Sequence, residues 1–303
     1  MYHYKAYECR IDSELVFPEL IESRSAENSS PPDIRISTGV VPEALANPTG
    51  RGVLYQASAN QFLLNMDGVA RYLVQNGNEI IVEPAPESLA GDVRVFLLGS
   101  CIGALLHQRG MLVLHAGAVY TDRGAVLFTG PSGIGKSTLL GELLRRGYRM
   151  MVDDVCAVVV DPAGSPLVLP GYPRTRLWTD SVQKLEQDIA EMERTRPGME
   201  KYERQIPAQF WDQRAPLHRI YLLTTSNRDE LKLEIVPRIR TFTAVLHNTY
   251  RQQFLDGLVM RAPHFGLVSA VARVSGVTRV VRPSHPFRLA ELADLIEQDL
   301  AQG

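Results

Sequence analysis

Cysteine is scarce in this sequence, which has only Cys9, Cys101 and Cys156 among its 303 residues. Their number is odd, they lie far apart, and none belongs to a Cys-x-x-Cys pair. This spacing argues against a disulfide framework and against a zinc site. We therefore expect three reduced thiols.

A long hydrophobic run is also missing. The longest nearly apolar stretch, residues 96–106, is shorter than the ~20 residues that a helix needs to cross a bilayer. The first ten residues, MYHYKAYECR, include charges where a signal peptide has an apolar stretch. We therefore expect a cytoplasmic protein with no membrane partner.

Neither sign of charge dominates. Lysine and arginine together number 32, aspartate and glutamate 34, and the formal net charge is -2. This balance argues against a nucleic-acid partner held by a broad basic surface. Hydrophobic residues at 45% and charged residues at 22% are ordinary for a globular protein, which excludes disordered and fibrous classes. The length allows one large domain or two of unequal size.

The N-terminal third is rich in strand and turn signals. Between residues 52 and 82, short apolar segments alternate with the turn signals Asp67-Gly68 and Asn76-Gly77, a pattern typical of β-hairpins. Residues 83–87, EPAPE, then stop regular structure. The predicted units are a small N-terminal β-rich domain over residues 1–90 and a second domain over residues 91–303.

The second domain is predicted to combine strands with helices. Apolar spacing and stop signals such as Gly110 and Gly147 define its elements. Antiparallel hairpins beside a strand, loop and helix unit predict an α/β fold with a mixed β-sheet. The predicted helices are 92–108, 136–146, 182–192 and 289–300, and the predicted strands are 112–119, 125–130, 149–154 and 156–160.

A phosphate-binding loop follows the strand 125–130. Residues 130–137, GPSGIGKS, match the pattern G-x-x-x-x-G-K-[ST] without a mismatch. In this motif backbone N–H groups turn toward phosphates, the lysine reaches the β- and γ-phosphates, and the serine hydroxyl faces Mg²⁺. The alternative is a Gly-rich turn before an ordinary helix. The residues expected to bind the nucleotide are Gly130, Pro131, Ser132, Gly133, Ile134, Gly135, Lys136, Ser137 and Thr138, and Ser137 is also expected at the metal.

Two adjacent carboxylates, Asp153 and Asp154, end the strand that follows the loop helix. One carboxylate at this place reaches the same Mg²⁺ as the loop serine, directly or through water. A second one is suited to accept the proton of an alcohol that attacks the γ-phosphate. The pair therefore favours phosphoryl transfer to a hydroxyl, and the alternative is two solvated acids at a strand end.

Three further side chains are candidates for the site. His115 lies in an apolar strand, where a lone histidine is more often a hydrogen-bonded core residue than a catalytic one. Arg174 and Arg176 follow a Pro-Gly turn, and such cations could hold an acidic substrate or stabilise a transferring phosphoryl group. The alternative for both arginines is a solvated surface position.

The combination of His115, the loop, its helix and Asp153-Asp154 resembles the catalytic domain of bacterial HPr kinase/phosphorylase, which is related in fold to phosphoenolpyruvate carboxykinase. The resemblance is strongest over residues 112–160. It implies that Asp153 is the acid/base residue facing a substrate serine and that Asp154 lies at the metal or its water shell. It also places His115 close to the catalytic centre.

The sequence also departs from that family. The Arg-Gly-x-Gly segment that follows the Asp pair in HPr kinases is replaced here by residues 169–178, LPGYPRTRLW, and residues 1–90 do not resemble the family's N-terminal domain. The layout is more similar to HPr kinase-related proteins encoded beside peptide biosynthesis enzymes, including kinases of the C-terminal serine of lasso peptide precursors. The segments with this similarity are 170–178, 216–221 and 247–251.

We therefore expect an ATP- and Mg²⁺-dependent kinase that phosphorylates a serine hydroxyl of a peptide or small protein. Its expected catalytic residues are Asp153, Lys136 and His115. The alternatives are a nucleotide-binding regulatory module without phosphotransferase activity and a small-molecule kinase. The sequence does not distinguish ATP from GTP, does not identify the acceptor, and leaves a homo-oligomer open.

Overall fold

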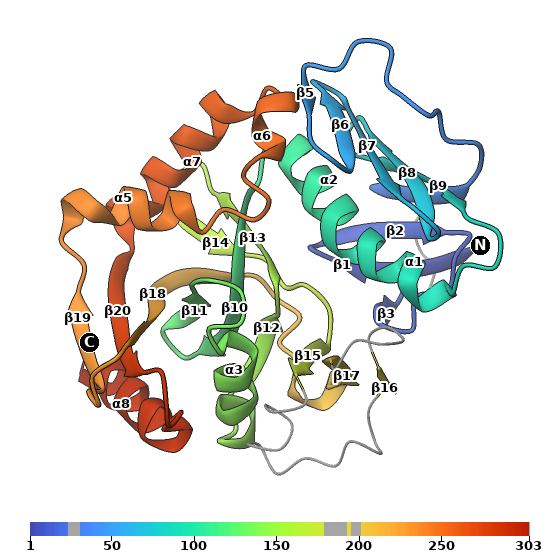
Figure 1. Cartoon of the computed structure of the whole chain (residues 1–303). Coiled ribbons are helices and arrows are strands. Elements are labelled where there is room, and N and C mark those ends of the chain that lie inside the picture. Colours follow the sequence, from blue (N-terminus) through green and yellow to red (C-terminus); the bar gives the residue numbers. More distant parts are fainter. Residues whose placement is uncertain (24–30, 179–192, 195–200, 303) are drawn as a thin grey trace.

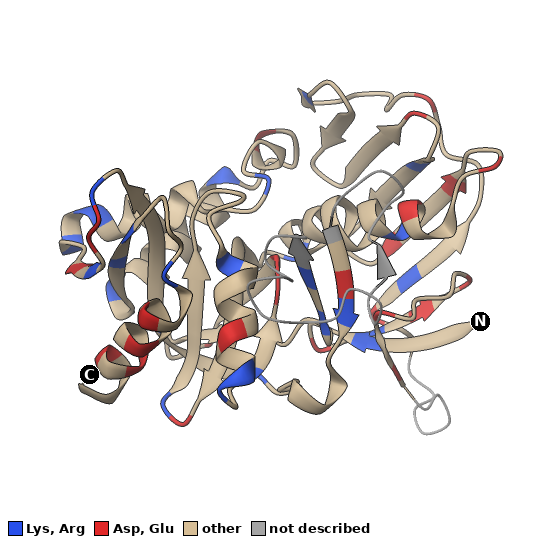
Figure 2. Ribbon diagram, turned by 60° about the horizontal axis from the view of Figure 1, so that its bottom comes forward, with Lys and Arg blue, Asp and Glu red and all other residues tan. Residues whose placement is uncertain are grey.

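Strands from both halves of the chain build three sheets in the computed structural model (Figure 1), which describes all residues except 24–30, 179–192, 195–200 and 303. The predicted α/β class with a mixed sheet is confirmed, because parallel and antiparallel pairs occur together in the two larger sheets. Basic and acidic positions are scattered over the ribbon in Figure 2, apart from several acidic positions along the last helix.

The N-terminal sheet has nine strands in the order β3-β1-β2-β4-β9-β8-β7-β6-β5. The predicted turns at Asp67-Gly68 and Asn76-Gly77 join β7 to β8 and β8 to β9, and Gly68, Asn76 and Gly77 have the positive φ angles that such turns need. The strands are β1 (Tyr2–Ala6), β2 (Cys9–Ser13), β3 (Ile21–Glu22), β4 (Ile34–Thr38), β5 (Gly50–Arg51), β6 (Tyr55–Ser58), β7 (Gln61–Met66), β8 (Ala70–Gln75) and β9 (Glu79–Pro84).

One continuous helical segment follows this sheet, made of α1 (Ala90–Phe96), a π-helical turn (Leu97–Cys101) and α2 (Ile102–Gln108). Contrary to the expectation from residues 96–106, this helix is long and apolar enough to cross a membrane by length and composition alone, but 67% of its apolar window is buried inside the protein. Its side chains share one hydrophobic cluster with both larger sheets. Because this helix packs against both sheets, the packing does not mark a domain boundary, and the boundary near residue 90 stays a prediction.

The central sheet has eight strands, with parallel pairs between β11 and β18 and between β18 and β20. Strands β12 and β13 both run antiparallel to β10, one after the other, and the chain breaks from β10 at Asp153-Asp154 between them. The strands are β10 (Leu112–Thr121), β11 (Gly124–Thr129), β12 (Arg149–Val152), β13 (Val155–Val160), β14 (Pro166–Val168), β18 (Ala215–Ser226), β19 (Lys232–Ile235) and β20 (Gly276–Pro283).

Helices cover both faces of the central sheet because its strands are apolar on both sides. Val126 and Phe128 of β11 pack toward α3 (Lys136–Arg145) and α8 (Leu289–Gln302). Ala125 and Leu127 alternate with them and pack in the cluster that contains side chains of α5 (Arg238–His247) and α7 (Arg261–Val274), which the short α6 (Phe254–Gly257) precedes.

A third, three-stranded sheet lies beside the central one and consists of β15 (Arg174–Trp178), β16 (Glu193–Arg194) and β17 (Lys201–Gln205), followed by a 3₁₀ turn (Pro207–Gln209). The predicted helix at 182–192 lies outside the described residues. The helices predicted at 136–146 and 289–300 and the hairpin before the loop are confirmed.

Candidate functional site

The phosphate-binding loop joins β11 to α3, so the strand and helix that the motif requires are both in place. Gly130 and Gly135 have φ angles of 140° and 100°, a region that L side chains rarely adopt. A Cβ on Gly130 would also lie 2.7 Å from the carbonyl oxygen of Leu223 in β18. Glycine is therefore required at the first position of the loop by both conformation and space.

Lys136 lies over the loop that it follows. Its Nζ donates hydrogen bonds to the carbonyl oxygens of Gly130 (2.8 Å) and Pro131 (3.0 Å), and the side chain is 7% exposed. The ammonium group is thus held at the concave side of the loop, where a phosphate chain would compete with these carbonyls for it.

Asp153 binds the loop helix and the third sheet at once. Its Oδ1 accepts a hydrogen bond from Ser137 Oγ (3.0 Å), and its Oδ2 accepts from Thr175 Oγ1 (3.0 Å) and from the backbone N–H of Arg176 (3.0 Å). Gly117 in β10 faces this carboxylate without a side chain of its own. Asp153 is therefore anchored next to the loop serine, on the side where that serine would meet a metal ion.

Asp154 points to the other predicted residue, His115. Its Oδ1 lies 2.9 Å from His115 Nδ1, and its Oδ2 lies 3.9 Å from Arg176 Nη1. Asp154 has a φ of 89°, which is strained for a residue with a Cβ. Strain of this kind persists where the surrounding contacts fix it, and here it turns two neighbouring carboxylates to different partners.

A pocket of about 720 Å³ opens beside this pair. It brings together the first residues of the loop, His115 and Asp154, and it is closed on the far side by the segment after α5. That segment is bonded to β10, since His115 N–H donates to Asn248 O (2.8 Å) and Tyr250 N–H donates to Val113 O (2.8 Å). The lining residues are His115, Gly130, Pro131, Ser132, Asp154, Leu222, Thr224, Ala244, His247, Asn248, Thr249, Tyr250 and Arg251.

Tyr250 and Arg251 are lining residues that the sequence did not single out for function, although the segment 247–251 contributed to the similarity noted above. Burial raises the pKa of Tyr250, and the carboxylate of Asp154 raises it further, so its hydroxyl stays protonated. Arg251 is exposed, and its guanidinium lies 5.8 Å from the Tyr250 ring centroid. This pocket wall therefore combines a protonated hydroxyl with an exposed cation.

Neither of the two predicted substrate arginines lines this pocket, although Arg176 contacts both Asp153 and Asp154. Arg174 is 3% exposed, and its Nη1 donates to Glu203 Oε2 (2.6 Å) and lies 3.4 Å from Glu19 Oε1. Arg176 Nε donates to Glu203 Oε1 (2.9 Å). Burial acts to lower the pKa of Arg176, but Tyr172, Glu203 and Asp154 raise it on balance, so its charge is retained. Both guanidinium groups thus bind acids of this chain, although Arg176 Nη2 is buried without a hydrogen-bond partner among the described residues.

Arg282 is a third residue that sequence reasoning missed. Its Nη2 donates to the carbonyl oxygen of Ile134 in the loop (2.7 Å), and its guanidinium lies 4.1 Å from the Phe287 ring centroid. Burial lowers the pKa of Arg282. No local pattern marks this arginine, because its contact with the loop joins residues 148 positions apart. Arg282 therefore contacts the loop through the Ile134 carbonyl group.

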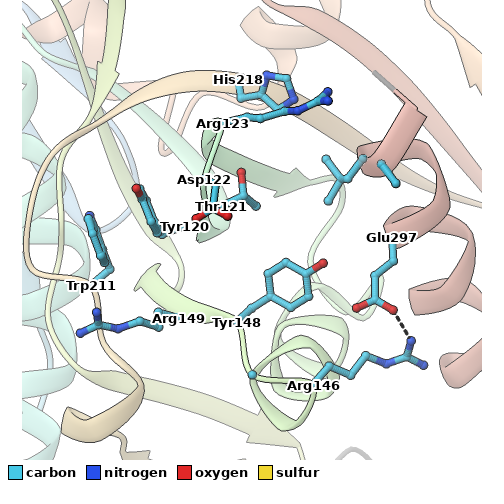
Figure 3. Close-up of a pocket in the computed structure, with 13 residues that line it drawn as sticks. Tyr120, Thr121, Asp122, Arg123, Arg146, Tyr148, Arg149, Trp211, His218 and Glu297 are labelled. Atoms are coloured by element: carbon cyan, nitrogen blue, oxygen red, sulfur yellow. Dashed lines mark hydrogen bonds and ion pairs between the residues drawn. The ribbon is translucent and has the colours of Figure 1, made fainter.

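A separate cavity of about 670 Å³ lies next to the C-terminal end of α3 and the turn of the β10–β11 hairpin (Figure 3). Tyr120 and Trp211 stack on one side of it with ring centroids 3.6 Å apart. Arg146 on the other side is bound to Glu142, Asp294 and Glu297. The described lining of this cavity contains no residue of the phosphate-binding loop and neither Asp153 nor Asp154. It is therefore not the candidate site.

Among the described residues, no group of three or more His, Cys, Asp or Glu side chains is arranged to hold a metal ion. Mg²⁺ does not need such a group, because it keeps several waters and binds proteins through one or two carboxylates together with substrate phosphates. The Ser137 hydroxyl and the Asp153 carboxylate fit that type of site.

The comparisons with known proteins give a distant structural likeness. No family model matches this chain, and no curated protein does. Among solved structures, the HPr(Ser) kinase/phosphatase from Coxiella burnetii is similar, with 14% sequence identity over 63% of this chain and 91% of that one and a TM-score of 0.34. A likeness at this level establishes neither the activity nor the substrate of this chain.

Proposed function

We propose that this protein is an ATP- and Mg²⁺-dependent kinase that phosphorylates a serine hydroxyl of a peptide or small protein. The observation that supports it best is the hydrogen bond between Ser137 of the loop and Asp153, with the His115–Asp154 pair next to it at the pocket wall. A phosphate-binding loop, a metal-side carboxylate and a second carboxylate facing a pocket are the parts that phosphoryl transfer to an alcohol requires.

The residues that would hold the nucleotide are those of the loop, with its backbone N–H groups and the Lys136 ammonium directed at phosphates. Ser137 and Asp153 would hold Mg²⁺. When bound, Mg-ATP supplies the phosphoryl group and neutralises part of its charge. The protein contributes position and electrostatic complementarity, which account for most of the rate in this reaction class.

We propose that the two aspartates exchange the roles that the family resemblance implied. The oxygens of Asp153 already accept three hydrogen bonds, one of them from the loop serine, which favours Asp153 at the metal. Asp154 lines the pocket with its Oδ1 2.9 Å from His115 Nδ1, which favours it as the acceptor of the serine proton.

The acceptor would enter from the wall that carries Tyr250 and Arg251. A pocket of this volume holds one side chain and its neighbours rather than a folded surface, which fits a serine in an extended peptide or a protruding loop. The C-terminal serine of a lasso peptide precursor is the narrowest form of this proposal, and it rests on the sequence similarity of residues 170–178, 216–221 and 247–251.

The test is transfer of the γ-phosphate of labelled ATP to a panel of serine peptides, with alanine peptides as acceptor controls. Wild type should label a serine peptide only in the presence of Mg²⁺, and Lys136→Ala should not. Lys232→Ala, which changes an exposed lysine of β19, is the matched control and should stay active. Binding of Mg-ATP without labelling of any peptide or of small alcohols would overturn the proposal and favour a nucleotide-binding regulatory module.

A further inference from the structure

The tip of the β1–β2 hairpin joins the N-terminal sheet to the candidate site. Ala6 pairs with Cys9, so the turn consists of Tyr7 and Glu8 alone. Their φ angles are 53° and 57°. Two-residue turns with positive φ at both positions are normally formed by Asn-Gly or Asp-Gly, because a larger side chain makes this conformation unfavourable. Tyrosine and glutamate therefore form a strained turn here.

The Tyr7 side chain is the part of this turn that reaches the catalytic region. It is 2% exposed, and its hydroxyl donates to the carbonyl oxygen of Val155 (3.1 Å), the residue directly after Asp154. Burial raises the pKa of Tyr7 well above its ordinary value, so the hydroxyl remains a donor. The first residue of β13, and with it the strained Asp154, is thus tied to the N-terminal sheet.

The tip of the hairpin also binds the segment 170–172, which precedes the residues that bind Asp153. Tyr7 N–H donates to Pro170 O (2.9 Å), and the Tyr7 ring packs edge-on against Tyr172 with centroids 6.3 Å apart. The chain continues from Tyr172 to Thr175 and Arg176, which bind Asp153. Gly171 leaves the space for this contact, since a Cβ there would lie 2.9 Å from Val152 and 3.6 Å from the Tyr7 ring.

We infer that Tyr7 is a positioning residue for the Asp153-Asp154 pair, through which the N-terminal sheet sets the geometry of the metal and proton-accepting carboxylates. Its two groups act on two sides of the pair, the hydroxyl after Asp154 and the ring before Thr175. Strain that the surroundings maintain in this way is typical of residues that pre-organise a site. This inference rests on the proposed function for its effect on turnover, but its effect on Mg-ATP binding does not require a peptide acceptor.

The test is Tyr7→Phe in the full chain, which keeps the ring and removes only the hydroxyl. The matched control is Tyr4→Phe, since Tyr4 is also 2% exposed in the same sheet and its hydroxyl accepts a hydrogen bond from Phe17 N–H (2.9 Å), away from the site. Both variants should lose a similar, small part of the unfolding free energy. Three quantities are measured, namely that free energy, the Mg²⁺ concentration for half-maximal ATP binding, and kcat.

Tyr7→Phe should raise the half-maximal Mg²⁺ concentration and lower kcat by about tenfold each, the range found when supporting residues of metal sites are removed. Tyr4→Phe should change neither. A Tyr7→Phe variant that behaves like Tyr4→Phe in all three measurements would overturn the inference. If wild type binds Mg-ATP but transfers phosphate to no acceptor, the proposed function fails, while the Mg²⁺ measurement still decides the role of Tyr7.

A second variant, Glu8→Gly, addresses the turn itself. It relieves the positive φ at one position and removes the ion pair between Glu8 and Arg214, but it leaves the Tyr7 hydroxyl in place. Unchanged Mg²⁺ dependence is expected for Glu8→Gly. A tenfold change in this variant would show that the hairpin as a whole, not the Tyr7 contact, controls the site, and it would contradict the inference.

Discussion

At the scale of single residues, the site separates two neighbouring aspartates by their partners. Successive residues of a strand point to opposite sides, so the sequence could predict that Asp153 and Asp154 face different surroundings but not which one faces the loop. The break between β12 and β13 decides it, because it turns Asp153 to Ser137 and Asp154 to His115.

This separation predicts different losses in two isosteric variants. Asp154→Asn should lower kcat by at least about 100-fold while ATP affinity stays near wild type, because a proton acceptor is lost and the loop is unchanged. Asp153→Asn should instead raise the Mg²⁺ concentration needed for ATP binding. Calorimetric ATP titrations at several Mg²⁺ concentrations, combined with transfer rates, check both; the reverse assignment of effects would restore the roles implied by the family resemblance.

The exposed cation at the pocket wall gives a further prediction. Arg251→Ala should raise the acceptor KM more than the ATP KM, because Arg251 lines the pocket but is not part of the phosphate-binding loop. Arg240→Ala, an exposed arginine on α5 outside the described lining, is the control and should change neither constant. Equal changes in both constants for Arg251→Ala would place Arg251 at the nucleotide instead.

At the scale of elements, the loop is contacted by strand β20, through two residues that are 148 positions apart in the sequence. The end of β20 places Arg282 against the loop carbonyl of Ile134, and Phe287 covers the guanidinium. A buried arginine without an acidic partner is costly, so its hydrogen bonds to carbonyl oxygens have to compensate for desolvation. Among the described contacts, Arg282 Nη1 also donates to Pro283 O (2.8 Å).

We therefore expect Arg282→Met to keep the volume behind the loop but to leave Ile134 O without this donor. The ATP KM should rise by about tenfold, which corresponds to the ~1.4 kcal/mol that one hydrogen bond of this kind contributes. The acceptor KM should not change. Arg279→Met is the control, because Arg279 lies three residues earlier in β20 and is partly exposed beside Glu234. An unchanged ATP KM in Arg282→Met would show that the loop keeps its shape unaided.

At the scale of the whole molecule, local patterns predicted the elements that depend on local chemistry. The loop, its strand and helix, and the turns at Asp67-Gly68 and Asn76-Gly77 follow from residues close in sequence. The strands β1 and β2 were not predicted, although the buried residues of YHYKA and CRIDS alternate with more exposed ones as in a half-buried strand. The burial of Arg174 between Glu203 and Glu19 also depends on pairs 29 and 155 residues apart.

The packing of the two halves against each other predicts a pH dependence of stability. His107 of α2 is 1% exposed, and its Nε2 donates to Tyr250 O (2.9 Å). This hydrogen bond joins α2 to the pocket wall. Burial lowers the pKa of His107 to about 4, and the nearby His264 acts in the same direction. The unfolded chain, with a histidine pKa near ~6.5, therefore binds more protons than the folded protein between these two values.

This difference in bound protons fixes the direction in which stability changes with pH. The contribution of His107 is complete above pH ~6.5 and is lost as the pH falls toward about 4, with a total of about 3 kcal/mol for this shift. Urea unfolding of wild type should thus show less stability at pH 5 than at pH 7.5. His107→Leu removes the titrating group, so the part of the loss due to His107 should disappear in this variant, whatever its stability at pH 7.5. An identical decrease in both proteins would show that other groups set the acid limit and that this contact between the halves does not titrate.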